Sequence, residues 1–180
     1  MKFKSFFVVF FLIFSGIIYG QEKPESADKI MADAYKIAGK ENKSVMIVFH
    51  ASWCSWCKKF EASVTDPSCR EYFEKHFVVR YLDILERGDK KNIENPGAID
   101  IFNINGGDGS GIPYFLIYDK NRNLISDSKM SAGEGKPKQN IGCPSSEEEA
   151  AAFIAILNKA EKVSDAEKVA ITERFKKNGK

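Results

Sequence analysis

The chain has 180 residues, with 27 Lys and Arg against 25 Asp and Glu. This length allows one domain with a proper core. The nearly balanced charge gives no support for nucleic acid as a partner, because phosphate binding relies on an excess of Lys and Arg. Four cysteines are too few for a disulfide scaffold, so we expect them to do chemistry or to form one extra bridge.

The first 20 residues predict a secretory signal peptide. A basic start is followed by an apolar run over residues 6–18 and by the small residue Gly20, which offers a cleavage edge. The run is too short to span a bilayer comfortably, and an uncleaved membrane anchor is the alternative. Removing residues 1–20 takes Lys and Arg from 27 to 25 against 25 Asp and Glu, so the remaining chain is neutral. No cysteine stands near the cleavage edge to accept a lipid, so we expect a soluble exported protein, periplasmic or secreted.

Two elements are predicted ahead of the first cysteines. Residues 26–40 carry apolar side chains at helical spacing, with Gly39 near the end, and predict an amphipathic helix. Residues 45–49 form a short run of β-branched and aromatic side chains, which predicts a strand buried on both faces. After this strand the spacing becomes helical again, so that Cys54 and Cys57 should lie on the first turn of a second helix.

These two cysteines form a C-x-x-C motif. The unpaired N–H groups and the positive end of the helix dipole stabilise a thiolate on Cys54, and a thiolate is the attacking species in disulfide exchange. Cys57 lies on the same face and can resolve a mixed disulfide. The same spacing also makes zinc knuckles, haem attachment sites and structural disulfides. Lys58 stands where haem attachment needs His, and Cys69 and His76 match no familiar zinc spacing, so no metal or cofactor is predicted.

The middle of the chain predicts a return to the sheet. Asp66 and Pro67 suit the cap and first position of a short helix that continues over residues 71–75. Residues 77–82 predict a second buried strand, joined to the first by a parallel right-handed crossover. A short helical piece is then predicted over residues 98–102.

A proline stands at the mouth of the next strand. The loop over residues 103–111 leads into Ile112 and Pro113, immediately before a strand over residues 114–118. Proline is confined to strand starts or edges, and a cis peptide bond is compatible with this place. Turn composition follows, and the apolar pattern resumes at Leu124, so these segments predict a hairpin.

The C-terminal third predicts a surface loop and two helices. Residues 131–142 have loop composition, and residues 145–149 and 164–167 supply capping boxes for the two helices. We see no internal repeat and no domain boundary within residues 21–180.

Together these motifs resemble the thioredoxin superfamily and, within it, the exported thioredoxin-like disulfide reductases. The resemblance rests on a buried strand, on W-C-x-x-C-K at residues 53–58, and on G-I-P at residues 111–113 before a hairpin and a closing helix. It covers residues 27–160, with a helical extension over residues 164–178. It implies an α/β thioredoxin fold, in which a central mixed sheet is flanked by helices, with a C-terminal helical extension.

The resemblance also implies a substrate site and an activity. Pro113 would be cis and packed beside the cysteine pair, and the backbone of Ile112 would pair with a substrate polypeptide by β-augmentation. Trp53 and Trp56 would form an apolar platform around the reactive sulfur, with ordinary packing as the alternative. The implied protein is a monomeric thiol–disulfide oxidoreductase acting on protein disulfides as a reductant. An upstream redox partner would recharge it, and a membrane-bound protein is one option for that partner.

Two features depart from thioredoxins proper. Those proteins carry a buried Asp six residues before the first cysteine, where this chain has Val48. Proton transfer at the second cysteine must then use solvent or another group such as Lys58. The loop over residues 103–111 is also longer than a minimal thioredoxin has, so substrate choice could be altered near the site.

Several alternatives stay open on the sequence. Cys69 and Cys143 either bridge each other or remain buried free thiols, because a bridge needs a short Cα distance that sequence does not give. His50 and His76 show no triad or ligand pattern and are expected to be structural. The rival function is a non-catalytic binding module in which the C-x-x-C pair is a structural disulfide. A disulfide isomerase is disfavoured, because no dimerisation domain is evident.

Overall fold

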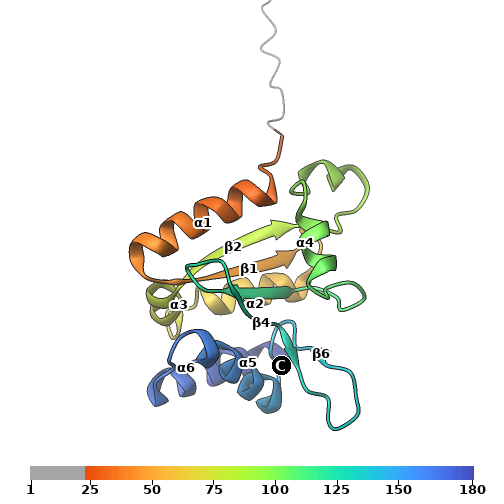
Figure 1. Ribbon diagram of the computed structural model, residues 1–180. Coiled ribbons are helices and arrows are strands. Elements are labelled where there is room, and N and C mark those ends of the chain that lie inside the picture. The colour runs from red at the N-terminus through yellow and green to blue at the C-terminus, as the bar shows by residue number, and fades with distance from the viewer. Residues whose placement is uncertain (1–22) are drawn as a thin grey trace, which may run out of the picture.

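A four-stranded mixed sheet with strand order β2-β1-β3-β4 forms the centre of the molecule (Figure 1). The computed structural model describes residues 23–180, so the predicted signal peptide lies outside the described residues. The strands are β1 (Ser44–His50), β2 (Phe77–Asp83), β3 (Tyr114–Tyr118) and β4 (Leu124–Asp127). β1 pairs parallel with β2 and antiparallel with β3, which pairs antiparallel with β4. The predicted parallel pairing, hairpin and mixed α/β fold are confirmed.

Helices cover both faces of this sheet (Figure 1). They are α1 (Ala27–Glu41), α2 (Ser55–Val64), α3 (Arg70–His76), α4 (Ala98–Ile104), α5 (Glu147–Ala160) and α6 (Asp165–Lys176). The 3₁₀ turns are η1 (Gly88–Ile93) and η2 (Lys177–Gly179). Both predicted capping boxes are present, at the starts of α5 and α6. None of the helices within residues 23–180 is long and apolar enough to cross a membrane.

Alternation along β1 divides the core into two layers. Val45, Ile47 and Phe49 face the layer that contains residues of α1 and α4. Met46 and Val48 point to the opposite layer, toward α2, α3, α5 and α6. All five side chains are at most 1% exposed. The prediction of a strand buried on both faces is confirmed.

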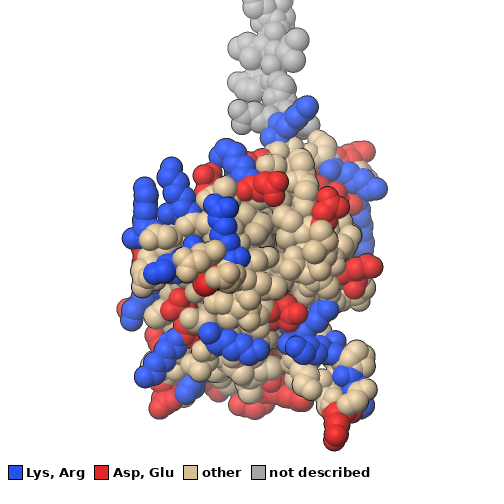
Figure 2. Space-filling model, viewed as in Figure 1, with Lys and Arg blue, Asp and Glu red and all other residues tan. Residues whose placement is uncertain are grey.

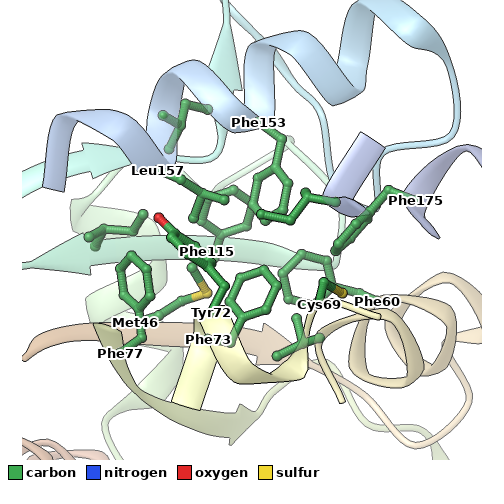
Figure 3. Packing of buried hydrophobic residues seen from close by; sticks show 14 of the residues in the cluster. Met46, Phe60, Cys69, Tyr72, Phe73, Phe77, Phe115, Phe153, Leu157 and Phe175 are labelled. Atoms are coloured by element: carbon green, nitrogen blue, oxygen red, sulfur yellow. The ribbon is translucent and has the colours of Figure 1, made fainter. Parts of the chain in front are cut away.

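The layer on the α2 side is built from aromatic rings. Phe60 of α2, Phe115 of β3, Phe153 of α5 and Phe175 of α6 converge there (Figure 3). Neighbouring rings lie 4.9 to 6.0 Å apart between centroids. Burial of each ring stabilises the fold by about 1.5–3 kcal/mol. The final helix is therefore part of the core through Phe175.

The ends of α1 and α3 differ from the sequence prediction. α1 runs past Gly39 to Glu41, and its C-cap is Asn42, whose φ of 53° lies in the left-handed region that Asn tolerates. α3 begins at Arg70, later than expected from Pro67. Asp66 caps a tight turn, where its Oδ1 accepts hydrogen bonds from the N–H and hydroxyl of Ser68.

Two further expectations are corrected. β2 is an edge strand, and Val79, Arg80 and Tyr81 are only half-buried rather than buried. The predicted loop over residues 131–142 contains β6 (Gln139–Asn140), which pairs antiparallel with β5 (Lys129–Met130). Strands of two residues are too short to leave an alternating pattern, so the sequence could not reveal this small sheet.

The surface in Figure 2 carries Lys and Arg interspersed with Asp and Glu. Over this face neither sign forms one continuous field. This distribution agrees with the nearly balanced charge of the sequence.

Candidate active site

Cys54 and Cys57 are joined by a disulfide at the start of α2, with their Cα atoms 5.3 Å apart. Cys54 is the N-cap residue, and the N–H of Cys57 donates to its Sγ at 3.1 Å. The N–H of Cys54 in turn donates to the carbonyl of Ala51, which closes the turn between β1 and α2. The predicted placement at a helix start is confirmed. In the reduced state the same N–H and the helix dipole would favour a thiolate on Cys54.

The peptide bond between Ile112 and Pro113 is cis and lies beside this disulfide. The carbonyl oxygen of Ile112 is 3.6 Å from the Sγ of Cys54. Ile112 also packs against a small buried cluster formed by Ala51 and the two cysteines. The structure thus brings together the two motifs that are about sixty residues apart in the sequence. Their roles in substrate binding stay a prediction.

Both predicted tryptophans are at the surface, Trp53 at 41% and Trp56 at 43% exposure. The indole N–H of Trp53 donates to the carbonyl of Leu85 at 2.8 Å, and the guanidinium of Arg87 lies 3.7 Å from the ring centroid. The ammonium of Lys59 lies 4.5 Å from the centroid of the Trp56 ring. The rings are therefore held at the surface by polar and cation–π contacts rather than packed into the core.

Glu86 is a site residue that the sequence reasoning missed. Its side chain is buried, at 3% exposure, and accepts from the N–H of Ser52 at 2.5 Å and from the Ser52 hydroxyl at 2.9 Å. The Nζ of Lys90 also donates to that hydroxyl, and the N–H of Glu86 donates to Glu94. The loop after β2 therefore holds the segment that leads into Cys54. Glu86 lies three residues after β2, in a polar loop, where a single acid gives no distinctive signal in the sequence.

Val48 stands where thioredoxins carry a buried Asp, six residues before the first cysteine. It is 1% exposed and lies opposite Tyr81 in β2. Two residues further along the same face, the Nε2 of His50 lies 3.2 Å from the Oδ1 of Asp83. Desolvation raises the pKa of Asp83 above its usual value. Burial likewise raises the pKa of Tyr81. Lys58, the proposed substitute for the missing acid, is exposed.

The other two cysteines are free thiols in the aromatic layer, so the alternative in which they bridge each other is wrong. Burial raises the pKa of Cys69 to about 11 and that of Cys143 to about 12. The thiol of Cys69 donates to the carbonyl of Ser63, and Asn178 donates to the sulfur of Cys143. Among residues 23–180, no cluster of three His, Cys, Asp or Glu side chains could hold a metal ion.

His50 and His76, which were expected to be structural, each lie beside an acid. The partner of His50 is Asp83, and the Nδ1 of His76 lies 3.4 Å from a carboxylate oxygen of Glu161. The His76 pair lies at the junction of α3 and the end of α5, and it links the two helices.

The mixed sheet, the disulfide at a helix start and the adjacent cis-proline define a protein of the thioredoxin fold. A family model described as thioredoxin-like matches residues 28–120, which is more than half of the chain. The chain belongs to this thioredoxin-like family. Within this family the Cys54–Cys57 disulfide lies at the start of a helix, beside the cis-proline.

Individual relatives share at most about a quarter of their residues with this chain over the matched regions. The thiol:disulfide interchange protein DsbD of Haemophilus ducreyi is 27% identical over 97 residues, or 53% of this chain. The chain spans only 15% of the length of that relative. Among solved structures, a disulphide isomerase from Xylella fastidiosa has a TM-score of 0.51 at 17% identity, covering 91% of this chain and 97% of that one. The DsbD C-terminal domain of Neisseria meningitidis has a TM-score of 0.42 at 16% identity, covering 58% and 84%. At 17% identity the likeness to the Xylella structure shows the fold alone.

Proposed function

We propose that this protein reduces protein disulfides in an exported compartment, with Cys54 as the nucleophile and Cys57 as the resolving thiol. One observation supports the proposal above all. The Sγ of Cys54, which caps α2, lies 3.6 Å from the carbonyl oxygen of Ile112. Backbone groups beside the nucleophile suit an extended polypeptide, because main-chain hydrogen bonds accept many sequences. Trp53 and Trp56 would border the bound segment, and Pro113 would hold Ile112 in place.

The reaction is two successive disulfide exchanges. The Cys54 thiolate attacks one sulfur of the substrate disulfide, forms a mixed disulfide and releases the other substrate sulfur as a thiolate, which takes up a proton. The Cys57 thiolate then attacks the Sγ of Cys54, releases the second substrate thiol and leaves the Cys54–Cys57 disulfide seen here. An upstream dithiol, which a membrane protein could supply, would return the pair to the reduced state.

The assignment of the two thiols is tested by trapping. Cys57→Ser should accumulate stable mixed disulfides with substrate proteins, because the resolving step is lost. Cys54→Ser should trap nothing and should abolish the reduction of insulin disulfides. The matched control is Cys69→Ser, which alters a buried thiol outside the site. Trapping by Cys54→Ser but not by Cys57→Ser would reverse the assignment.

The direction of electron flow is tested by equilibration with glutathione. The residue before Cys57 is Trp56, which cannot carry a positive charge, so the thiolate of Cys54 should be only moderately stabilised. We expect a reduction potential of roughly −270 to −200 mV, against about −120 mV for a strong oxidant. A potential above about −150 mV would indicate an oxidase. A wild-type protein that reduces no protein disulfide would favour the binding module with a structural disulfide.

A further inference from the structure

The side chain of Asn140, in β6, reaches across to the loop that contains the cis-proline. Its Nδ2 lies 3.1 Å from the carbonyl oxygen of Ser110, 3.3 Å from that of Gly111 and 3.1 Å from that of Pro113. An amide nitrogen has two hydrogens, so the three acceptors share them. The Asn140 side chain therefore contacts carbonyl oxygens on both sides of Ile112.

The orientation of this amide is fixed from its other end. The Oδ1 of Asn140 accepts from the hydroxyl of Ser128 at 2.7 Å and from the N–H of Gly142 at 3.0 Å. A flipped amide would place its oxygen against three carbonyl oxygens and its nitrogen against the N–H of Gly142. Ser128 is fully buried, so the acceptor end is anchored in the protein interior. The donor end is thereby aimed at the loop.

Asn140 donates to the carbonyls of Gly111 and Pro113, and Ile112 lies between these two residues. The carbonyl of Ile112 faces the Sγ of Cys54, and within residues 23–180 no hydrogen bond engages its N–H. We propose that Asn140 is a positioning residue, which occupies the neighbouring carbonyls and so presents the N–H and C=O of Ile112 to an extended substrate segment. This inference rests on the proposed function. It assigns the role to a residue beyond the stretch 28–120 matched by the family model.

The test separates the two ends of the amide. Asn140→Asp keeps an oxygen for Ser128 and Gly142 but loses the donor, and its charge repels the three carbonyls. We expect the KM for a protein disulfide to rise about tenfold, as for loss of one hydrogen-bonded contact. The kcat should change less than about twofold, because Cys54 itself is untouched. Hydroxyethyl disulfide, which offers no peptide backbone, should be reduced at the wild-type rate.

The matched control is Gln139→Ala, an exposed neighbour in the same strand, which should leave both substrates unaffected. The inference would be overturned if Asn140→Asp lost equal activity on the protein disulfide and on hydroxyethyl disulfide. It would also be overturned if the variant lost no activity on either substrate. If Asn140→Asp does not fold, Asn140→Ala removes the amide donor without adding charge, and the same outcomes decide.

A second readout does not depend on activity. Amide hydrogen exchange over residues 110–114 should be faster in Asn140→Asp than in the wild type or in Gln139→Ala. A wild-type chain that reduces no protein disulfide would refute the proposed function, whereas exchange still reports on Asn140. Unchanged exchange in this segment would overturn the positioning role whatever the enzyme does.

Discussion

The two pairs of cysteines have almost the same solvent exposure but different surroundings. Cys54 and Cys57 are each 4% exposed, while Cys69 and Cys143 are 4% and 6% exposed. The first pair lies at a helix start, beside the carbonyl of Ile112 and two exposed tryptophans. The second pair lies in the aromatic layer. Burial alone therefore does not decide the chemistry of a cysteine, and its polar neighbours do.

A buried amide links the surroundings of the second pair. The Nδ2 of Asn178 lies 3.0 Å from the hydroxyl of Ser63 and 3.2 Å from the sulfur of Cys143. Cys69 donates to the carbonyl of the same Ser63. The Cys69 thiol donates in its neutral form, and at Cys143 burial outweighs the N–H of Asn178, so the pKa of both thiols is raised.

The largest expected difference between the pairs is in alkylation rate. After mild reduction at pH 8, Cys54 should react with iodoacetamide at least about 100-fold faster than Cys69 or Cys143. A pKa raised by two units leaves about 100-fold less thiolate. Peptide mapping by mass spectrometry gives the rates. In denaturant all four thiols should react alike, and rapid labelling of Cys69 or Cys143 in the folded protein would contradict the comparison.

The buried pair should also make the fold sensitive to alkali. The pKa is 9.0 for an ordinary thiol and is raised by burial to about 11 for Cys69 and about 12 for Cys143. The unfolded chain therefore loses these protons first as pH rises. Stabilisation from the neutral thiols is complete below pH 9 and is lost as pH rises through the folded-state values. By pH 10 the loss should be about 1 kcal/mol per thiol.

Urea unfolding at several pH values measures this loss. The double variant Cys69→Ala, Cys143→Ala should show a shallower fall in the free energy of unfolding between pH 8 and 10. Buried tyrosines with raised pKa values, such as Tyr72, contribute a slope common to both proteins. Identical slopes would show that the two thiols do not titrate as the structure indicates.

The sequence predicted where Cys54 and Cys57 lie, at a helix start, and that Pro113 would be cis beside them, because these residues belong to motifs with fixed spacing. Their catalytic and substrate-binding roles stay predictions. Glu86 was not predicted, because a single acid in a polar loop resembles any solvated residue until its partner Ser52 is known.

The elements of the fold were likewise predicted only in part. The ends of β1 were predicted within one residue, and the capping box predicted over residues 145–149 is present at the start of α5. β6 was not predicted, because it is two residues long. Asn140 lies in that strand, and its contacts with residues 110–113 join segments almost thirty residues apart. Such long-range polar contacts leave no periodic signal in a single sequence.

A smaller effect is expected from the charge of Glu86. Glu86→Gln removes a buried negative charge near the loop that ends at Cys54 but keeps an acceptor for the N–H of Ser52. A nearby negative charge disfavours a thiolate, so the midpoint pH for alkylation of Cys54 should fall. Asp89→Asn, an exposed change in η1, is the control and should leave the midpoint unchanged. No shift in Glu86→Gln would limit Glu86 to a packing role.

The smallest expected effect comes from Trp56→His, which tests whether the residue before Cys57 tunes the reduction potential of the Cys54–Cys57 pair. In Trp56→His a protonated imidazole would stand before Cys57 and would stabilise the Cys54 thiolate, and with it the reduced form. Lys59 lies against the ring of Trp56, and its positive charge should oppose that protonation. We therefore expect a less negative reduction potential by only about 15 mV, or about threefold in the equilibrium constant with glutathione. Trp56→Phe keeps an uncharged ring and should leave the potential unchanged. Combining Trp56→His with Lys59→Gln should enlarge the shift, and no movement in either His variant would show that this position does not tune the site.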